Sequence, residues 1–270
     1  MSTLDNSNIS VHLGKTSQYK SQYDPNLLVR EPRSNNRKHL SISDEDLPFI
    51  GFDTWNAYEV SALNKNGLPV TAFAKITYSA SSKYIVESKS LKLYLNSFNM
   101  TYFKSSNYLE IYSSLEYTIA QDLSALLESP VTVKLFDACI QDTNLQSVIT
   151  DISSYVTLER MTDHVKDVVC DQYVETPDLL EGINTNDSVT TQQYHSSLLK
   201  SNCRVTSQPD WGDIYITYRG KYSIVPESLL RYIVSFRDEC HFHEEICETI
   251  YKRLYDKFQP DELTVTCLYV

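Results

Sequence analysis

A cysteine and an aspartate seven residues apart are the side chains of this sequence best suited to covalent chemistry. Cys203 lies in Ser201–Asp213, a stretch of turn-forming residues that leads into an expected strand at Ile214, and Arg204 follows it directly. A neighbouring cation favours a thiolate and a carboxyl group such as Asp210 can move protons, so the stretch has the parts of an activated nucleophile. The alternative is a loop cysteine without a reaction, beside an aspartate that only caps the Pro-Asp-Trp-Gly turn.

The segment Cys240–Cys247 is the densest group of metal-ligand and acid–base side chains. His243 and Cys247 are four residues apart, so a helix would place them on one face, as a metal pair requires. No second matched pair is close in sequence, although Cys203 could join them in space. Two other interpretations stay open: Cys247 lies in the core with His243 and Glu244 at a helix start, or Glu244 accepts two N–H donors from a purine-like edge.

A third candidate is a ligand site in Val86–Tyr94. Two lysines and two serines surround Glu87 there, which would suit a phosphate-bearing ligand, whereas the alternative is a solvated amphipathic face. The sequence has no Gly-x-Gly-x-x-Gly motif, no P-loop and only six glycines, which argues against a Rossmann or Walker nucleotide site.

The periodicity of apolar residues predicts the elements that position these candidates. In the first half the expected elements are a turn at Asn66–Gly67, a strand over 70–78, a helix over 108–128 and a strand over 131–136, with 91–98 fitting either a helix start or a strand end. In the second half they are a strand over 214–218, a turn at 219–220, helices over 229–236 and 243–258, and a strand over 263–268.

The two halves match each other in sequence. Ser90–Phe98 and Ser228–Phe236 share Ser, Leu, Tyr, Ser and Phe in one register, and Thr132-Val matches Thr264-Val one strand later. We interpret this as an internal duplication of a unit that reads strand, strand, helix, helix, strand. The predicted organisation is an N-terminal arm (1–45), a first half (46–150), a surface linker (151–190) and a second half (191–270).

Composition narrows the class of protein. The 270 residues are 41% hydrophobic and 22% charged, an ordinary globular balance for one large domain or two small ones. The net charge of −11 repels nucleic acid, and no basic patch is visible, so no nucleic-acid partner is expected. The sequence begins without a secretory signal and no apolar run approaches about 18 residues, so we expect a cytoplasmic protein with no membrane partner and with reduced cysteines.

Three motifs are similar to those of one enzyme family. Glu87–Phe98 resembles the signature of the NADPH-dependent 7-cyano-7-deazaguanine reductases of queuosine biosynthesis, which are nitrile reductases. Asn202–Gly212 resembles their catalytic loop, and Phe242–Glu245 resembles the start of their substrate-binding helix. The segments Tyr19–Pro25 and Phe52–Glu59 are similar to the longer, duplicated branch of the family.

The resemblance implies an α+β fold of tandem tunnelling-fold (T-fold) halves, each an antiparallel sheet backed by paired helices, in a homodimer with active sites at interfaces. It implies that Cys203 adds to the nitrile carbon of 7-cyano-7-deazaguanine to form a covalent thioimide, and that Asp210 protonates the nitrile nitrogen. Two hydrides from NADPH would then give the aminomethyl product. The implied binding residues are Val86, Glu87, Ser88, His243 and Glu244 for the substrate and Ser88 and Lys89 for NADPH, with no metal.

One feature departs from the family pattern. Members continue past the last strand with an Arg-Arg-Gly-Gly motif that resembles a cofactor-phosphate clamp, and this sequence stops at Val270, where that motif would begin. The explanations left open are truncation, compensation by basic residues such as Lys89 and Lys92, or a purine-binding protein without reductase activity. A zinc-dependent pterin-type T-fold enzyme with Cys240, His241 and His243 at its site is the remaining alternative.

Overall fold

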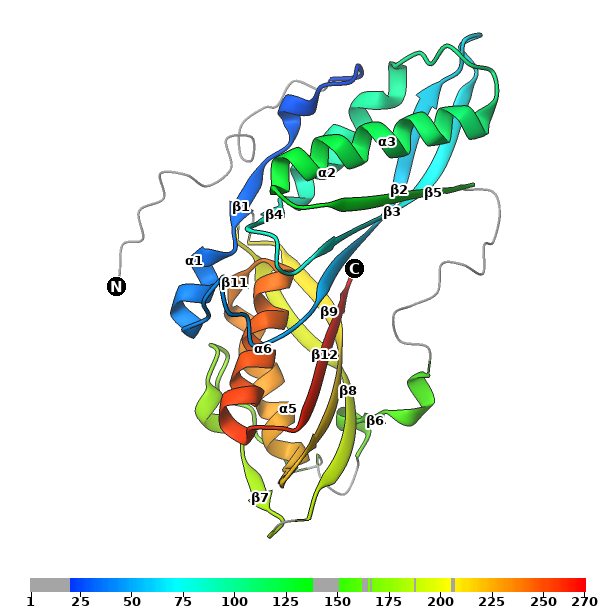
Figure 1. The fold of residues 1–270 in the computed structure, drawn as a ribbon. Coiled ribbons are helices and arrows are strands. Elements are labelled where there is room, and N and C mark those ends of the chain that lie inside the picture. Colours follow the sequence, from blue (N-terminus) through cyan, green and yellow to red (C-terminus); the bar gives the residue numbers. More distant parts are fainter. Residues whose placement is uncertain (1–19, 138–150, 162–164, 166, 187, 205–206) are drawn as a thin grey trace. The chain divides into compact units, whose positions relative to one another are not determined.

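The computed structural model describes residues 20–137, 151–161, 165, 167–186, 188–204 and 207–270 (Figure 1). The chain divides into two compact units, Met1–Gln146 and Ser147–Val270, each with its own hydrophobic core. We call them unit 1 and unit 2 and describe each by itself. No described helix combines the length and the apolar character that crossing a bilayer requires.

Unit 1 is an antiparallel sheet of three strands, in the order β2-β3-β5, packed against two helices (Figure 1). A two-stranded ribbon, β1-β4, and the four-residue helix α1 complete it. The bounds are β1 (Arg30–Pro32), α1 (Ser34–Arg37), β2 (Phe52–Leu63), β3 (Pro69–Ser79), β4 (Tyr84–Val86), α2 (Ser88–Asn96), α3 (Tyr108–Leu127) and β5 (Val131–Asp137).

Side chains of β3 point alternately to the two faces of the sheet, and this alternation explains which face packs against the helices. Ala72, Ala74 and Ile76 are all 1% exposed or less and face the core that α2 and α3 cover. Phe73 points to the other face, where its ring lies 4.8 Å from that of Tyr58. Residues 91–98, which the sequence left undecided, are helical because Glu87 begins α2 by accepting hydrogen bonds from its first turn.

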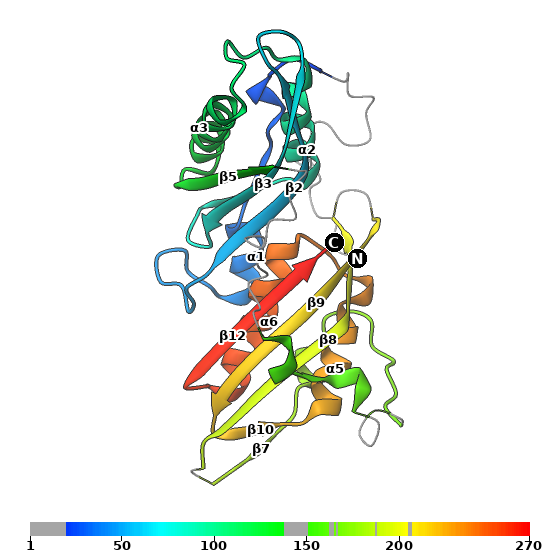
Figure 2. The same cartoon turned by 90° about the vertical axis from the view of Figure 1, so that its right-hand side faces the viewer.

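Unit 2 repeats this order of elements around a sheet in the order β11-β8-β9-β12, with β6 also paired to β8. Figure 2 looks onto this sheet, with the helices α5 and α6 behind it. The bounds are β6 (Val156–Thr157), β7 (Gly182–Asn184), β8 (Thr190–Cys203), β9 (Pro209–Gly220), β10 (Tyr222–Ile224), α5 (Pro226–Val234), β11 (Cys240–His241), α6 (His243–Phe258) and β12 (Glu262–Tyr269).

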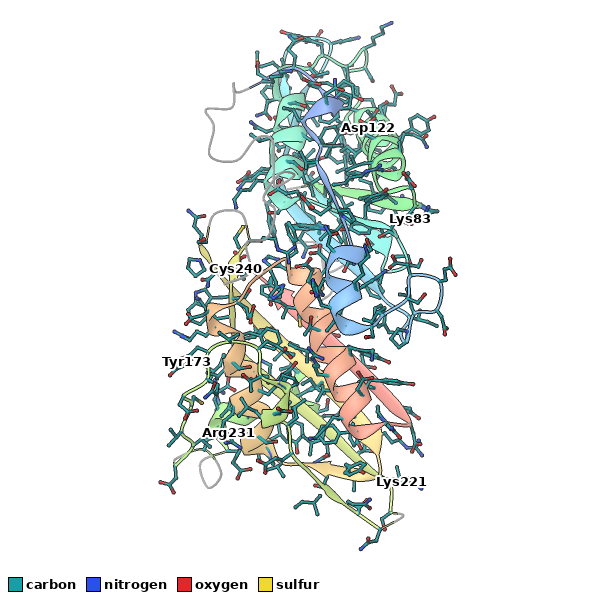
Figure 3. The ribbon with its side chains drawn as sticks, turned by 90° about the vertical axis from the view of Figure 1, so that its left-hand side faces the viewer. Lys83, Asp122, Tyr173, Lys221, Arg231 and Cys240 are labelled. Atoms are coloured by element: carbon teal, nitrogen blue, oxygen red, sulfur yellow. The ribbon has the colours of Figure 1, made fainter. Side chains whose placement is uncertain are left out.

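The predicted strands and helices are present in both units, with three differences in unit 2. The helix expected over 229–236 is α5, which begins three residues earlier, at Pro226, and is followed by a 3₁₀ segment from Ser235. The strand expected over 214–218 is the middle of a longer β9 that starts at Pro209. The turn expected at 219–220 falls one residue later, at Lys221 (Figure 3), because Arg219 and Gly220 still pair with β8. The first strand of each hairpin also carries a register shift, between Ala57 and Val60 in β2 and between Ser196 and Leu199 in β8.

The described residues of the expected arm (20–45) and linker (151–161, 165, 167–186 and 188–190) include side chains that pack within the two units. In unit 1, Arg37 is 1% exposed and holds Asp44 at 2.8 Å, so the chain before β2 is packed rather than extended. In unit 2, Leu158 and Leu180 are each 1% exposed and belong to the core, which a surface linker would not do. Their apolar side chains give the physical reason, because burying them stabilises the fold.

Each unit contains a similar strap before its main hairpin, residues 21–32 in unit 1 and 173–184 in unit 2. A short 3₁₀ turn opens with Pro-Asn-Leu-Leu at Pro25 and with Pro-Asp-Leu-Leu at Pro177. The Asp24 N–H donates to Ser97 Oγ at 3.2 Å, and the Thr176 N–H donates to the corresponding Ser235 Oγ at 3.3 Å. The set of elements that the two units share is therefore longer than the predicted repeat, because it includes the strap and the ribbon that follows it.

A polar cluster around the buried Tyr232 holds the strap of unit 2. The Glu175 carboxylate accepts hydrogen bonds from the Tyr232 hydroxyl at 3.0 Å and from Arg253 Nε at 3.1 Å. Tyr232 is fully buried, and burial together with the nearby Glu175 carboxylate raises the pKa of its hydroxyl well above the usual value. The Tyr173 carbonyl, at the start of the strap (Figure 3), accepts the Asp238 N–H at 2.8 Å.

Candidate active site

Cys203 and Asp210 lie at the tip of the β8–β9 hairpin. Cys203 is the last residue of β8 and Asp210 is the second residue of β9. The Cys203 N–H donates to the Gln208 carbonyl at 2.8 Å, which closes the loop between the strands. The loop is shorter than the turn-rich Ser201–Asp213 suggested, since Pro209 already begins a strand, a position where a missing N–H is tolerated.

The two-residue strand β11 brings the start of α6 beside the nucleophile. It pairs in parallel with the end of β8, with His241 opposite Cys203 and Cys240 opposite Asn202. Because neighbouring residues of a strand point to opposite faces, Cys240 (Figure 3) projects from the face opposite to that of Cys203 and His241. α6 then begins at His243, two residues farther along the chain.

Asp210 and His243 meet across this junction. The His243 Nε2 and Asp210 Oδ2 atoms are 3.3 Å apart, and both side chains are about a quarter exposed. The His243 ring stacks on Tyr269 of β12, with 4.0 Å between centroids and 3° between planes. Gly212 makes room for that stack, because a Cβ there would lie 3.1 Å from the Tyr269 ring. The arrangement fixes the imidazole against the Asp210 carboxyl.

The first turn of α6 carries two buried carboxylates. Glu244 is 9% and Glu245 is 5% exposed, and both lie where the helix dipole stabilises negative charge. The Glu245 carboxylate accepts the Phe242 N–H at 3.1 Å, so it caps the helix. Glu244 lies between this cap residue and His243, which places it in the same turn as the histidine that meets Asp210.

His241 is held between two carboxylates. Its Nε2 atom is 3.0 Å from Glu239 Oε2 and its Nδ1 atom is 3.2 Å from Glu245 Oε2. Burial disfavours the imidazolium, but the hydrogen bonds to Glu239 and Glu245 outweigh it and raise the pKa of His241 to about 9. The same contact with His241 lowers the pKa of Glu239. His241 is therefore a cation at neutral pH.

The other four expected binding residues belong to unit 1. Val86 is 1% exposed at the end of β4, and Ser88 and Lys89 form the first turn of α2. Glu87 is 2% exposed, and its carboxylate accepts the Lys89 N–H at 3.1 Å and the Ser90 N–H at 2.6 Å. A carboxylate accepts about four hydrogen bonds, so a Glu87 fixed as a helix cap keeps sites for a ligand.

The cysteine and histidine cluster is not arranged as a metal site. Cys247 is partly buried, and its thiol contacts the Val265 carbonyl at 3.7 Å and the thiol of Cys267. His241 uses both ring nitrogens on carboxylates. Within the parts of the chain that the structure describes, no three ligand-type side chains are placed to hold a metal ion.

Two features of the site escaped the sequence analysis. Tyr269 was missed although Val265 and Cys267 precede it at a spacing of two, which is the signal that places all three on the core face of β12. The contact of Arg204 with Glu245, 2.8 Å between Nη2 and Oε2, joins residues 41 positions apart. No local pattern in the sequence indicates such a pair.

Comparison with known proteins places this geometry in a family. The family model described as "Nitrile reductase, 7-cyano-7-deazaguanine-reductase N-term" matches residues 19–135, and the model "QueF-like protein" matches residues 209–270. The chain is 40% identical over 257 residues to the NADPH-dependent 7-cyano-7-deazaguanine reductase of Rickettsia massiliae (strain Mtu5), covering 95% of this chain and 87% of that protein. It is 41% identical to the enzyme of that name from Dechloromonas aromatica (strain RCB), over 95% of this chain and 84% of that protein.

A third relative with the same name, from Colwellia psychrerythraea (strain 34H / ATCC BAA-681), is 40% identical over 264 residues, which covers 95% of this chain and 86% of that protein. The class that these matches define is the nitrile reductases, which are oxidoreductases. The chain belongs to the family of NADPH-dependent 7-cyano-7-deazaguanine reductases.

Proposed function

We propose that this protein reduces the nitrile of 7-cyano-7-deazaguanine to the aminomethyl group of 7-aminomethyl-7-deazaguanine with NADPH, in tRNA queuosine biosynthesis. The observation that carries the proposal is the 3.3 Å contact between Asp210 and His243, near the tip of the β8–β9 hairpin, where β8 ends at Cys203. It unites a nucleophile, a proton donor and a substrate-binding residue at one place in unit 2, in a chain that belongs to this family.

The Cys203 thiol is the nucleophile of the proposed reaction. Its S–H proton passes to the Asp210 carboxylate, a C–S bond forms to the nitrile carbon, and the triple bond becomes the C=N double bond of a thioimide. The developing charge falls on the nitrogen, where Asp210 delivers a proton, so that the product carries one N–H. Covalent addition replaces one difficult step by two easier ones, and a positioned acid contributes typically 10²- to 10⁴-fold. The histidine stacked on Tyr269 orients the Asp210 carboxyl for this transfer.

The first turns of α6 and α2 are the proposed substrate-binding elements. Glu244 would accept the N–H donors of the deazaguanine edge, and its burial strengthens such charge-assisted hydrogen bonds. His243, Val86, Glu87 and Ser88 are the other proposed contacts. The capping bonds of Glu87 keep its carboxylate in one orientation, which lowers the entropy lost on binding.

The cofactor residues of the proposal fit a phosphate-bearing dinucleotide. Ser88 and Lys89 offer a hydroxyl and an ammonium group from the first turn of α2, where the helix dipole favours an anion. Glu87 already accepts the backbone N–H groups of Lys89 and Ser90, so the side chains rather than the backbone would hold the phosphate. NADPH, when bound, supplies hydride, and the four-electron change from nitrile to amine needs two of them with two protons.

The finer architecture is also part of the proposal. The repeated order of elements and the repeated strap support two tandem T-fold halves, and we expect a homodimer with active sites at interfaces. Cys170, Cys240, Cys247 and Cys267 are free thiols, and we expect a cytoplasmic protein. The net charge of −11 supports a small-molecule substrate without a nucleic-acid partner.

The experiment that tests the proposal is intact-mass analysis after mixing the protein with 7-cyano-7-deazaguanine in the absence of NADPH. We expect the wild-type mass to rise by one nitrile molecule, with the adduct mapped to Cys203, and no adduct in Cys203→Ala. Asp210→Asn should form the adduct at least about 100-fold more slowly, because the nitrogen then has no proton donor. An adduct on another residue, or equal rates in Asp210→Asn and wild type, would refute the assigned roles.

A further inference from the structure

Arg204, which directly follows the nucleophile, contacts the segment that leads into α6. Its Nη2 atom is 2.8 Å from Glu245 Oε2, the oxygen that the imidazolium of His241 also contacts. Its Nε atom lies 3.5 Å from the Cys240 carbonyl, and its guanidinium lies 5.4 Å from the centre of the Phe242 ring. All three contacts of Arg204 fall on residues 240–245, the segment that leads into the substrate-binding turn.

A single oxygen of Glu245 joins the hairpin to the helix. Oε2 accepts the Phe242 N–H, which caps α6, and the same atom receives Arg204 and His241. The Glu245 side chain is 6% exposed, so these contacts are formed away from water. One buried oxygen atom therefore contacts both Arg204, on the nucleophile loop, and the first turn of α6.

The cluster of Arg204, Glu245 and His241 is also connected to the strap of unit 2, through Glu239. His241 contacts Glu239, whose second oxygen accepts the Glu175 N–H of the strap at 2.9 Å. Arg204 and His241 supply two positive charges, and Glu239 and Glu245 supply two negative charges, so the group is neutral as a whole. The charge of Arg204 is matched by Glu245, which leaves it little net field for stabilising a Cys203 thiolate.

We propose that Arg204, Glu245, His241 and Glu239 form a clamp that positions the nucleophile loop against the substrate-binding turn, and that Arg204 and Glu245 are positioning residues rather than activators of the thiol. This inference rests on the proposed function, because it assigns the clamp to the addition of Cys203 to the nitrile. A misplacement of about 1 Å between reacting groups costs roughly 100-fold in rate. Loss of the clamp should therefore slow nitrile addition without changing the intrinsic reactivity of the thiol.

The test compares two reactions of Cys203 in wild type, Arg204→Met, Arg204→Lys and the control Arg219→Met. Arg219 lies at the opposite end of β9 from Asp210 and makes an exposed ion pair with Glu262. Adduct formation at saturating 7-cyano-7-deazaguanine depends on the relative position of thiol and substrate, whereas alkylation of Cys203 by iodoacetamide, followed by peptide mass mapping, depends on the thiolate. We expect Arg204→Met to slow adduct formation about 10- to 100-fold with alkylation within about threefold of wild type.

Arg204→Lys keeps a cation for Glu245 and should recover most of the adduct rate, and Arg219→Met should match wild type. The proposal fails if Arg204→Met forms the adduct at the wild-type rate. It also fails if alkylation falls as much as addition, because Arg204 would then act on the charge of the thiol.

Hydrogen exchange tests the clamp without any substrate. Peptides covering the hairpin tip and the first turn of α6 should exchange faster in Arg204→Met than in wild type, and Arg219→Met should leave them unchanged. If wild type forms no adduct but these peptides respond, the proposed function is wrong and the clamp stands. If wild type forms the adduct and exchange at the tip is the same in all variants, the clamp is refuted and the proposed function stands.

Discussion

The imidazolium of His241 makes the stability of unit 2 depend on pH above neutrality. The pKa of His241 is about 9 in the folded protein against an ordinary value of 6.5, because two carboxylates overcome the effect of burial. A group whose pKa is raised by folding stabilises the protein fully below its unfolded value. That contribution is lost as the pH rises through the folded value, so the free energy of unfolding should fall between about pH 6.5 and 9.

The magnitude follows from the two pKa values. Each pH unit between them corresponds to about 1.4 kcal/mol, which sets an upper bound of roughly 3 kcal/mol. The side chain of His241 is 23% exposed, so water weakens its ion pairs and we expect about 2 kcal/mol. The lowered pKa of Glu239 acts in the acid range and does not contribute in this window.

Urea unfolding can be followed in unit 2 alone. The chain has two tryptophans, Trp55 in β2 of unit 1 and Trp211 in β9 of unit 2, so a Trp55→Phe background leaves Trp211 as the reporter. In that background the free energy of unfolding should fall by at least about 2 kcal/mol from pH 6.5 to 9.5. With His241→Gln added, the fall should be about 2 kcal/mol smaller, and what remains comes from groups such as the Cys170 and Cys267 thiols, whose pKa values folding also raises.

An equal fall in both proteins would refute this reasoning, because other groups would then account for the whole pH dependence. A rise in stability with pH in the Trp55→Phe protein would contradict the sign derived from the Glu239 and Glu245 contacts.

Two further predictions concern packing in unit 2. Glu175→Ala should lower the free energy of unfolding by about 2 kcal/mol in urea denaturation, because the buried hydroxyl of Tyr232 and the guanidinium of Arg253 lose their acceptor. The control Glu262→Ala removes an exposed ion pair and should change the free energy of unfolding by less than about 0.5 kcal/mol. Gly182→Ala should lower the free energy of unfolding by about 2 kcal/mol in the same assay, since the added Cβ would lie 2.6 Å from the buried ring of Phe258. The control Gly51→Ala should be close to neutral, because the atom nearest to its added Cβ is 3.5 Å away. Equal effects within either pair of variants would contradict the contacts on which these values depend.

The parts of the fold that local periodicity encodes could be predicted from the sequence. The helix His243–Phe258 has the predicted bounds, and β3 lies within one residue of them, because each element buries one face at a regular spacing. The straps could not be recognised as core elements by periodicity, since a few residues of 3₁₀ turn carry no period. Their shared Pro-Asn-Leu-Leu and Pro-Asp-Leu-Leu sequences were the available signal.

The candidate site was predicted as a set of residue types rather than as a geometry. The types and spacing of Cys203 and Asp210 indicated a nucleophile and an acid, but the contact of Asp210 with His243 depends on β9 and α6 packing together in three dimensions. Arg204 illustrates the same limit: its place after the nucleophile suggested activation of the thiol, and the structure directs it to Glu245 instead.

The most direct test of the proposed function is the stoichiometry of NADPH oxidation with 7-cyano-7-deazaguanine, measured from the loss of NADPH absorbance with Cys203→Ala alongside. The proposed mechanism predicts two NADPH oxidised for each nitrile consumed by the wild-type protein and no oxidation by the variant. Absence of NADPH oxidation by the wild type, or oxidation at equal rates by both proteins, would contradict it.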